Sequence, residues 1–174
     1  SIGVLKLCEP GPQPPAIAFE PPLPWRKRLA IALFRMEPAT KLSFAFDRCV
    51  WAHLPEFVYL VQPGLFARWW VSASPTPTDE ASASASSGRP RKLHTITCYV
   101  TAERARIVDA LPEREALAAA LRELAQMLHR EHDELARHLI EARRVSWAAN
   151  ELVRGGYATV PIGCADIRGA LKAS

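Results

Sequence analysis

The residues of this sequence that are best placed to do chemistry lie close together near its C-terminal end. Trp147 ends an alternating run, an Arg-Gly-Gly turn follows at residues 154–156, and Tyr157 opens a second apolar run that ends at Gly163. Neighbouring glycines permit positive φ and let the backbone pass close to a bulky group. Large aromatic side chains on either side of such a turn can form the two walls of a slot. The alternative is a hairpin with two aromatic side chains in the core.

Lys41 is the candidate for a chemical role outside this stretch. Leu42, Phe44 and Phe46 alternate with Lys41 and small residues, which predicts a half-buried strand. Lys41 falls on the polar side of that strand. By itself, such a lysine is typical of a solvent-facing strand position. A chemical role for it has to be argued from the rest of the chain.

The sequence lacks the motifs of several other enzyme and binding-site classes. The sequence has no G-x-S-x-G, no G-x-x-x-x-G-K, no C-x-x-C and no G-x-G-x-x-G. Its four cysteines are far apart, which favours isolated thiols over a disulfide framework or a zinc site. His129, His132 and His138 lie among acidic residues, where a weak metal site and a solvated helix end are the two readings. We expect the solvated helix end and no metal site.

Length and composition indicate one globular domain. The 174 residues are 49% hydrophobic and 23% charged, values that suit a chain able to bury a core. The net charge of +4 permits an acidic partner without demonstrating one. No apolar run reaches the roughly 18 residues of a membrane span, and the N-terminus lacks a signal-peptide pattern. We therefore expect an intracellular protein without a membrane partner.

The elements expected to position the candidate residues are alternating strands and amphipathic helices. Leucines recur at 117, 121, 124 and 128, which predicts a helix with one face docked on a sheet. Trp25, Leu29 and Leu33 predict an apolar face for a short helix that follows Pro24. Further helices are expected to begin after Thr101 and at Pro112. The expected strands are 1–6, 17–19, 40–46, 57–61, 68–71, 93–100 and 139–147.

Residues 72–92 form a low-complexity segment rich in serine, alanine and proline. The segment contains no bulky apolar side chain that could offset its ordering entropy by burial. We expect it to be a disordered insertion in a surface loop.

Several motifs together resemble the flavin-dependent amine oxidases, the family of polyamine oxidases and lysine-specific histone demethylases. The series begins with G-V-L-K at residues 3–6 and I-A-F-E-P-P-L-P at 17–24, followed by a basic helix with Ala30-Ile31. T-K-L-S-F follows at 40–44, and Trp147 is separated by nine residues from Tyr157. The same motifs occur in this order in the family.

The resemblance implies roles for the candidate residues. In the family, a lysine at the position of Lys41 hydrogen-bonds a water beside flavin N5, so Lys41 is the expected catalytic residue. Trp147 and Tyr157 are expected to wall the substrate pocket. The expected cofactor-binding residues, which contact FAD, are Trp147, Gly155, Gly156, Tyr157 and Gly163.

The resemblance also implies the fold. It is α+β, with a mixed β-sheet and helices packed on one face (the amine-oxidase substrate domain), plus cut-off pieces of the FAD-binding domain at both ends. We expect residues 1–146 to be an incomplete substrate-binding domain and residues 147–174 to start a truncated FAD-contacting segment. Because the dinucleotide-binding motif is missing, we expect the chain to be a fragment that is inactive alone.

The implied function is oxidation of an amine C–N bond to an imine and then an aldehyde, with release of hydrogen peroxide. The expected substrate is a small amine such as a polyamine, or a methylated lysine side chain of a peptide. Direct nucleic-acid binding is not expected, and chromatin partners are expected only for a demethylase-like protein. The compartment would then be the nucleus, whereas a polyamine oxidase would be cytoplasmic or peroxisomal. The alternative function is a non-catalytic interaction module that retains the substrate-domain fold.

Overall fold

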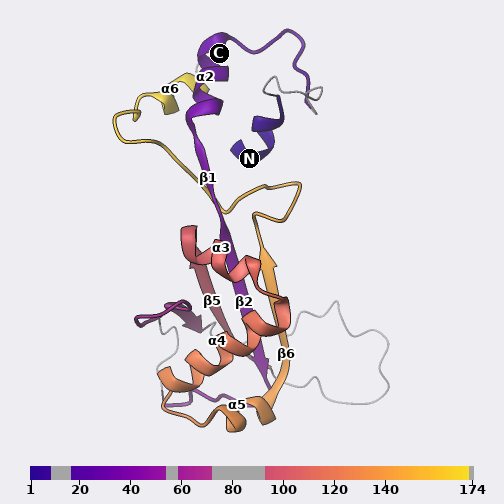
Figure 1. The fold of residues 1–174 in the computed structure, drawn as a ribbon, viewed down its shortest axis with the longest axis vertical. Helices are drawn as coiled ribbons and strands as arrows, with labels where there is room; N and C mark the ends of the chain where they lie inside the picture. Colours follow the sequence, from indigo (N-terminus) through magenta and orange to yellow (C-terminus); the bar gives the residue numbers. More distant parts are fainter. Residues whose placement is uncertain (9–16, 54–58, 72–92, 173–174) are drawn as a thin grey trace. The chain divides into compact units, whose positions relative to one another are not determined.

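The computed structural model of this chain describes residues 1–8, 17–53, 59–71 and 93–172. They fall into two compact units (Figure 1). Unit 1 comprises Ser1–Ala39, Thr101–Glu103 and Ser146–Ser174, and unit 2 comprises Thr40–Val100 and Arg104–Val145. The low-complexity segment 72–92 lies outside the described residues, so its predicted disorder stays a prediction.

Unit 2 is built on a five-stranded sheet within the described part of the chain. The strand order is β3-β4-β5-β2-β6, and the β3–β4 and β4–β5 pairs are antiparallel. The strands are β2 (Ala39–Phe46), β3 (Tyr59–Val61), β4 (Arg68–Val71), β5 (His94–Thr101) and β6 (Leu139–Ser146). The strands expected at 40–46, 68–71, 93–100 and 139–147 are thereby confirmed.

Strand β2 has two chemically different sides, as its alternating sequence predicts. Leu42, Phe44 and Phe46 are fully buried and join the hydrophobic core. Lys41 and Ser43 are half-buried and lie on the opposite side, because successive side chains of a strand point to opposite faces. One strand therefore supplies both the packing of unit 2 and its candidate lysine.

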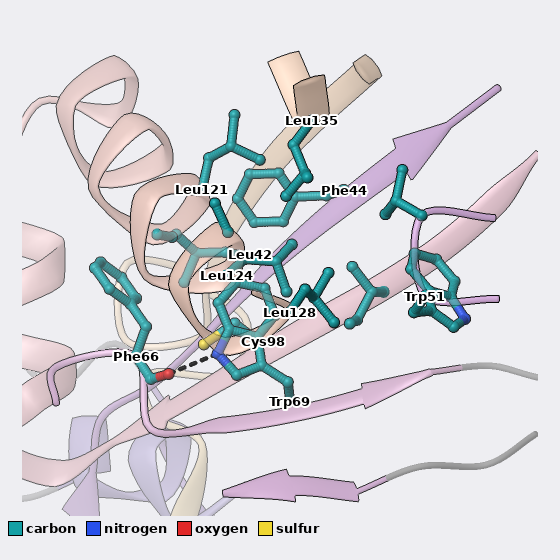
Figure 2. Close-up of a cluster of buried hydrophobic side chains, with 14 of the residues drawn as sticks. Leu42, Phe44, Trp51, Phe66, Trp69, Cys98, Leu121, Leu124, Leu128 and Leu135 are labelled. Carbon is teal, nitrogen blue, oxygen red and sulfur yellow. Dashed lines mark hydrogen bonds between the residues drawn. The ribbon is translucent and has the colours of Figure 1, made fainter. Parts of the chain in front are cut away.

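Helices pack on the apolar side of this sheet. They are α3 (Ala102–Ala110), α4 (Glu113–Met127) and α5 (His132–His138). Leu121 and Leu124 of α4 and Leu135 of α5 gather with Leu42 and Phe44 in one cluster (Figure 2). The α+β fold with helices on one face of a sheet is confirmed.

The loop between β3 and β4 is tied to helix α4 through one residue, Glu123. The backbone N–H of Phe66 donates to Glu123 Oε2 at 3.1 Å, and the side-chain amide of Gln62 donates to the Glu123 carbonyl at 3.4 Å. The Phe66 side chain next to this contact is fully buried. The hairpin that carries Trp69 and Trp70 is thus fixed at its turn as well as along its strands.

Unit 1 contains short elements drawn from both ends of the chain. Strand β1 (Arg35–Glu37) pairs antiparallel with β7 (Tyr157–Thr159), with Glu37 opposite Tyr157. Its helices are α1 (Ile2–Leu5), the 3-10 helix η1 (Lys6–Cys8), α2 (Trp25–Leu33) and α6 (Ile167–Lys172). Helix α2 contacts α6, and Lys6 Nζ donates to the carbonyl of Ala32 at 3.0 Å.

Three expectations for unit 1 are wrong. The first residues form helix α1 instead of a strand, because the Ser1 hydroxyl accepts the Gly3 N–H and caps it. Residues 17–19 form no strand; the alternation there is too short to define one without a pairing partner. Helix α2 begins at Trp25 as predicted, but it buries Ala30 and Ile31, and Trp25 is 67% exposed. A short helix has too few residues for its periodicity to show which face is buried.

The buried Cys98 gives a testable pH dependence. Burial raises the pKa of its thiol far above the ordinary value, Glu123 adds to the increase, and a backbone hydrogen bond from Arg68 opposes it. In the unfolded chain the same thiol ionises above about pH 8.5. Above that pH the unfolded state binds fewer protons than the folded state. The free energy of unfolding is therefore unaffected by this thiol below about pH 8.5 and falls as the pH rises further.

We expect the free energy of unfolding to decline above about pH 8.5 by up to about 1.4 kcal/mol per pH unit from this one group. Urea titrations between pH 7 and 10 measure the decline, and Cys98→Ala removes this part of it. An unchanged slope in Cys98→Ala would contradict the assignment.

Candidate functional site

In unit 1, backbone hydrogen bonds draw the Trp147–Tyr157 stretch into a closed loop. The Trp147 N–H donates to the carbonyl of Ala39, and the Gly155 N–H donates to the carbonyl of Trp147, both at 2.9 Å. Arg154 has a φ of 57° and Gly155 a φ of 140°, so the chain turns sharply before Tyr157. Trp147 is therefore brought next to the glycine pair although seven residues lie between it and Gly155.

The loop is not a hairpin with two aromatic core residues. Strand β7, which begins at Tyr157, pairs with β1 and not with the strand that ends before Trp147. Trp147 and Tyr157 are both half-buried, so each keeps part of its ring exposed. Their proposed role as pocket walls stays a prediction.

The three candidate glycines differ in what makes a glycine necessary. A Cβ at Gly156 would lie 2.1 Å from the Ala39 Cβ, and a Cβ at Gly155 would lie 2.7 Å from the Met36 Cε. At Gly163, with a φ of 83°, a Cβ would meet no described atom within 4 Å. Packing thus requires a glycine at 156, and the positive φ disfavours a side chain at both Gly155 and Gly163, although Gly163 has open space beside its backbone.

The open space beside the exposed Gly163 leaves room for a flat aromatic cofactor such as the isoalloxazine ring of FAD, as the space beside the exposed Gly169 also would. On this observation the residues present are compatible with the flavin that the sequence resemblance implies. Gly163 and the half-buried rings of Trp147 and Tyr157 are the residues of unit 1 that would hold it. The structural reasons for Gly155 and Gly156 are independent of any cofactor.

Unit 2 places Lys41 in an aromatic and polar environment. The Lys41 Nζ lies 5.7 Å from the centroid of the Trp70 ring, within the range of a cation–π interaction. The Trp70 ring in turn lies 5.8 Å from that of Tyr99. Ser43 and Thr97 join their hydroxyls at 3.1 Å between β2 and β5. We call Lys41, Ser43, Trp70, Thr97 and Tyr99 the polar face of unit 2.

Sequence reasoning identified only Lys41 in this set. Trp70, Thr97 and Tyr99 come from β4 and β5, and Trp70 reaches Lys41 only in the register that pairs Trp70 with Thr97. The alternation within each strand gives the side of each residue. The neighbours across strands depend on pairing, which a single sequence does not specify.

Thr40 anchors the strand just before Lys41. It is fully buried, and its hydroxyl donates to Asp109 Oδ1 of α3 at 2.7 Å. A buried hydroxyl needs such a partner, because leaving it unpaired costs about 1–3 kcal/mol. The contact fixes the start of the run that carries Lys41.

A cavity of about 830 Å³ lies on the other side of the unit 2 sheet. Phe44 of β2, Leu117 and Leu121 of α4 and Leu139 of β6 give it an apolar lining. Phe44 points away from the side that bears Lys41. The cavity is therefore separate from the polar face and holds none of the predicted site residues.

The histidines near α5 make individual contacts. His138 Nδ1 lies 2.9 Å from Asp47 Oδ1, and His132 Nδ1 lies 3.1 Å from Asp133 Oδ1. In the described parts of the chain, no three His, Cys, Asp or Glu side chains are grouped so that they could hold a metal ion. Nor is any helix in those parts both long and apolar enough to cross a membrane.

Solved structures of two amine oxidases have a similar fold. A variant of putrescine oxidase redesigned in its cofactor binding shares 18% identity, with a TM-score of 0.64 over 87% of this chain and 30% of that one. Cyclohexylamine oxidase from Brevibacterium oxydans IH-35A also shares 18% identity and a TM-score of 0.64, over 88% of this chain and 30% of its own. The chain thus spans about a third of the length of these structures.

Wild-type putrescine oxidase bound to putrescine matches as well, at 18% identity and a TM-score of 0.61. Identity this low establishes the fold alone. No curated protein sequence matches the chain significantly. The sequence profile described as "Flavin containing amine oxidoreductase" matches residues 1–171, nearly the whole chain. This protein belongs to the flavin-containing amine oxidoreductase family.

Proposed function

We propose that this chain is part of an FAD-dependent amine oxidase that acts on a C–N bond of a polyamine or of a methylated lysine side chain. The observation that carries the proposal is the position of Lys41, on a sheet side lined by aromatic rings and hydroxyls. The overall reaction would convert an amine, oxygen and water into an aldehyde, a smaller amine and hydrogen peroxide.

FAD and the residues of this chain would have different roles in the reaction. FAD, when bound, supplies the redox chemistry by accepting a hydride from the carbon next to the amine nitrogen and passing the electrons to oxygen. Lys41 would hold a water molecule through its ammonium or amine group. Trp147 and Tyr157 would wall the amine pocket, because aromatic faces attract cationic groups. Gly163 would allow the backbone to lie against the flat ring.

The substrate class follows from the same chemistry. Aromatic walls suit a small cationic or neutral amine, and the structurally similar oxidases are named for putrescine and cyclohexylamine. We propose a polyamine or another small amine as the first class to test, with a methylated lysine peptide as the second. The compartment would follow the substrate: cytoplasm or peroxisome for a polyamine, nucleus for a histone lysine.

The proposal is tested by Lys41→Met in the flavin-containing protein that carries this chain. Removing a group that positions a reacting water should lower kcat by about 100-fold. Amine-dependent release of hydrogen peroxide, measured over a panel of polyamines, monoamines and methylated lysine peptides, gives kcat and KM. Lys27→Met is the matched control, because it removes the same charge from helix α2 and should leave kcat unchanged.

An unchanged kcat in Lys41→Met would contradict the role of this lysine. Absence of both flavin absorbance and amine oxidation would contradict the catalytic proposal and favour an interaction module with the same fold. The 174-residue chain by itself is a further control. We expect it to show neither flavin absorbance nor activity, because the sequence contains no dinucleotide-binding motif.

A further inference from the structure

The Lys41 side chain reaches over a neighbouring strand to its aromatic contact. In the sheet order, β5 lies between β2, which carries Lys41, and β4, which carries Trp70. The 5.7 Å between Nζ and the Trp70 ring centroid therefore requires the lysine to extend across β5. A lysine at an open strand position would distribute over many rotamers. In this structure the Lys41 side chain points toward the Trp70 ring.

The Trp70 ring has an aromatic neighbour on the adjacent strand β5. In the register of the sheet, Trp70 lies opposite Tyr59 on β3 and opposite Thr97 on β5. The Tyr99 ring packs against it with centroids 5.8 Å apart and planes inclined by 56°. The Ser43–Thr97 contact joins β2 to β5 on the same side of the sheet. The Tyr99 ring therefore limits the positions that the Trp70 ring can adopt.

An ion pair with a carboxylate would be the alternative way to hold the Lys41 ammonium group. Among the residues that the structure describes, no carboxylate forms an ion pair with Lys41. The face of a tryptophan attracts a cation through its quadrupole and, unlike a carboxylate, leaves the hydrogen-bond donors of the ammonium free for water. That property suits a lysine whose task is to hold a water molecule.

We propose that Trp70 is a positioning residue for Lys41, and that Tyr99 supports Trp70 in that role. The inference rests on the proposed function only in assigning a task to Lys41; the contact itself does not depend on it. Trp70 does not need to touch substrate. It restricts the lysine amine to one location on the polar face, where the amine can hold a water at a reproducible position.

The first test uses the 174-residue chain without cofactor. A ring current shifts the signals of nuclei above an indole face, so the Cε protons of Lys41 should resonate upfield of those of Lys27 in a proton–carbon correlation spectrum. Lys41→Arg assigns the signal by removing it. In Trp70→Leu we expect the upfield shift to be lost, and in Trp70→Phe to be retained in part. Tyr99→Leu should reduce it, because Trp70 loses its support.

Controls separate positioning from folding. Trp25→Leu removes an exposed tryptophan of unit 1 and should leave the Lys41 signal unmoved. The methyl signals of Leu124 in the core of unit 2 report whether Trp70→Leu remains folded. If Lys41 resonates with Lys27 in the unaltered chain, or keeps its shift in folded Trp70→Leu, the proposal is overturned.

The second test uses the flavin-containing protein and a double-mutant cycle. Trp70→Leu should lower kcat about tenfold with a smaller change in KM. Combined with Lys41→Met, it should cause no further loss, because residues that act through one another are not additive. Additive losses would show that Trp70 acts independently of Lys41 and would overturn the proposal. If the protein oxidises no amine, the proposed function fails, while the spectroscopic test of the contact still stands.

Discussion

Replacing Trp69 by alanine should lower the free energy of unfolding of unit 2 by about 3–5 kcal/mol, the range for a buried tryptophan or phenylalanine. Trp69 is fully buried and belongs to the cluster drawn in Figure 2. Its ring lies 5.8 Å from that of Phe44, and its indole N–H donates to the Phe66 carbonyl at 2.6 Å. The substitution therefore leaves a large cavity and a buried carbonyl without its partner.

Two variants make this measurement specific. Trp69→Phe keeps most of the ring volume and loses the hydrogen bond, so it should cost less than Trp69→Ala. Trp25→Ala removes a tryptophan that is 67% exposed and should change stability by less than about 0.5 kcal/mol. Urea titration with hydrogen exchange of the α4 and β5 amides assigns the losses of the Trp69 variants to unit 2. A cost below about 1 kcal/mol for Trp69→Ala would show that this cluster is not the core.

Replacing Gly156 by alanine should destabilise unit 1 by about 3 kcal/mol, the upper part of the usual range for an overpacked site. The new Cβ would lie 2.1 Å from the Ala39 Cβ and 3.1 Å from the Ala39 backbone nitrogen. The Gly156 N–H donates to the Glu37 carbonyl at 2.8 Å, so the backbone cannot move away without losing this bond. We expect the β1–β7 pairing to open.

The control for this variant is a second glycine of unit 1. A Cβ at Gly169 of helix α6 would meet no described atom within 4 Å, so Gly169→Ala should be neutral or stabilising by about 0.5–1 kcal/mol. Hydrogen exchange of the β7 amides measures both effects. Ala39→Gly should partly rescue Gly156→Ala, because it removes the closest contact. Equal stability of Gly156→Ala and the unaltered chain would contradict the packing reason for this glycine.

This packing reason sharpens the site assignment. Gly155 and Gly156 were expected from the resemblance to contact FAD, and the structure provides an explanation for both within unit 1. Their requirement for glycine is therefore not evidence of a cofactor. Gly163 is favoured by its φ of 83° but has no neighbour within 4 Å of a built Cβ, so it is the better position at which to probe flavin contact.

The sequence predicted those elements whose pattern is local and long enough to read. The alternation of residues 40–46 placed Leu42 and Phe44 in the core and Lys41 on the other side, as the structure has them. The leucines of α4 predicted its docking on the sheet, and Pro112 marks its start. These predictions depend on the 2-residue period of strands and the 3.6-residue period of helices.

The same reasoning failed where segments were short. The four-residue helix α1 carries too few residues to express a period, and its Ser1 cap decides its structure. The buried side of the nine-residue α2 is set by its neighbours in unit 1 and not by its most apolar stripe. The location of each sequence-predicted site residue is known, but their joint action as a site stays a prediction.

By itself, the sequence determined the family, through motifs that recur in one order along the chain. It also determined the type of most strands and helices and the side of β2 on which Lys41 lies, because these depend on residue order along one segment. Only the tertiary structure decided that β5 separates β2 from β4, that Trp70 meets both Lys41 and Tyr99, and that Ala39 requires a glycine at 156. These contacts join residues that are distant in sequence. They depend on strand register and close packing, for which no local pattern is a substitute.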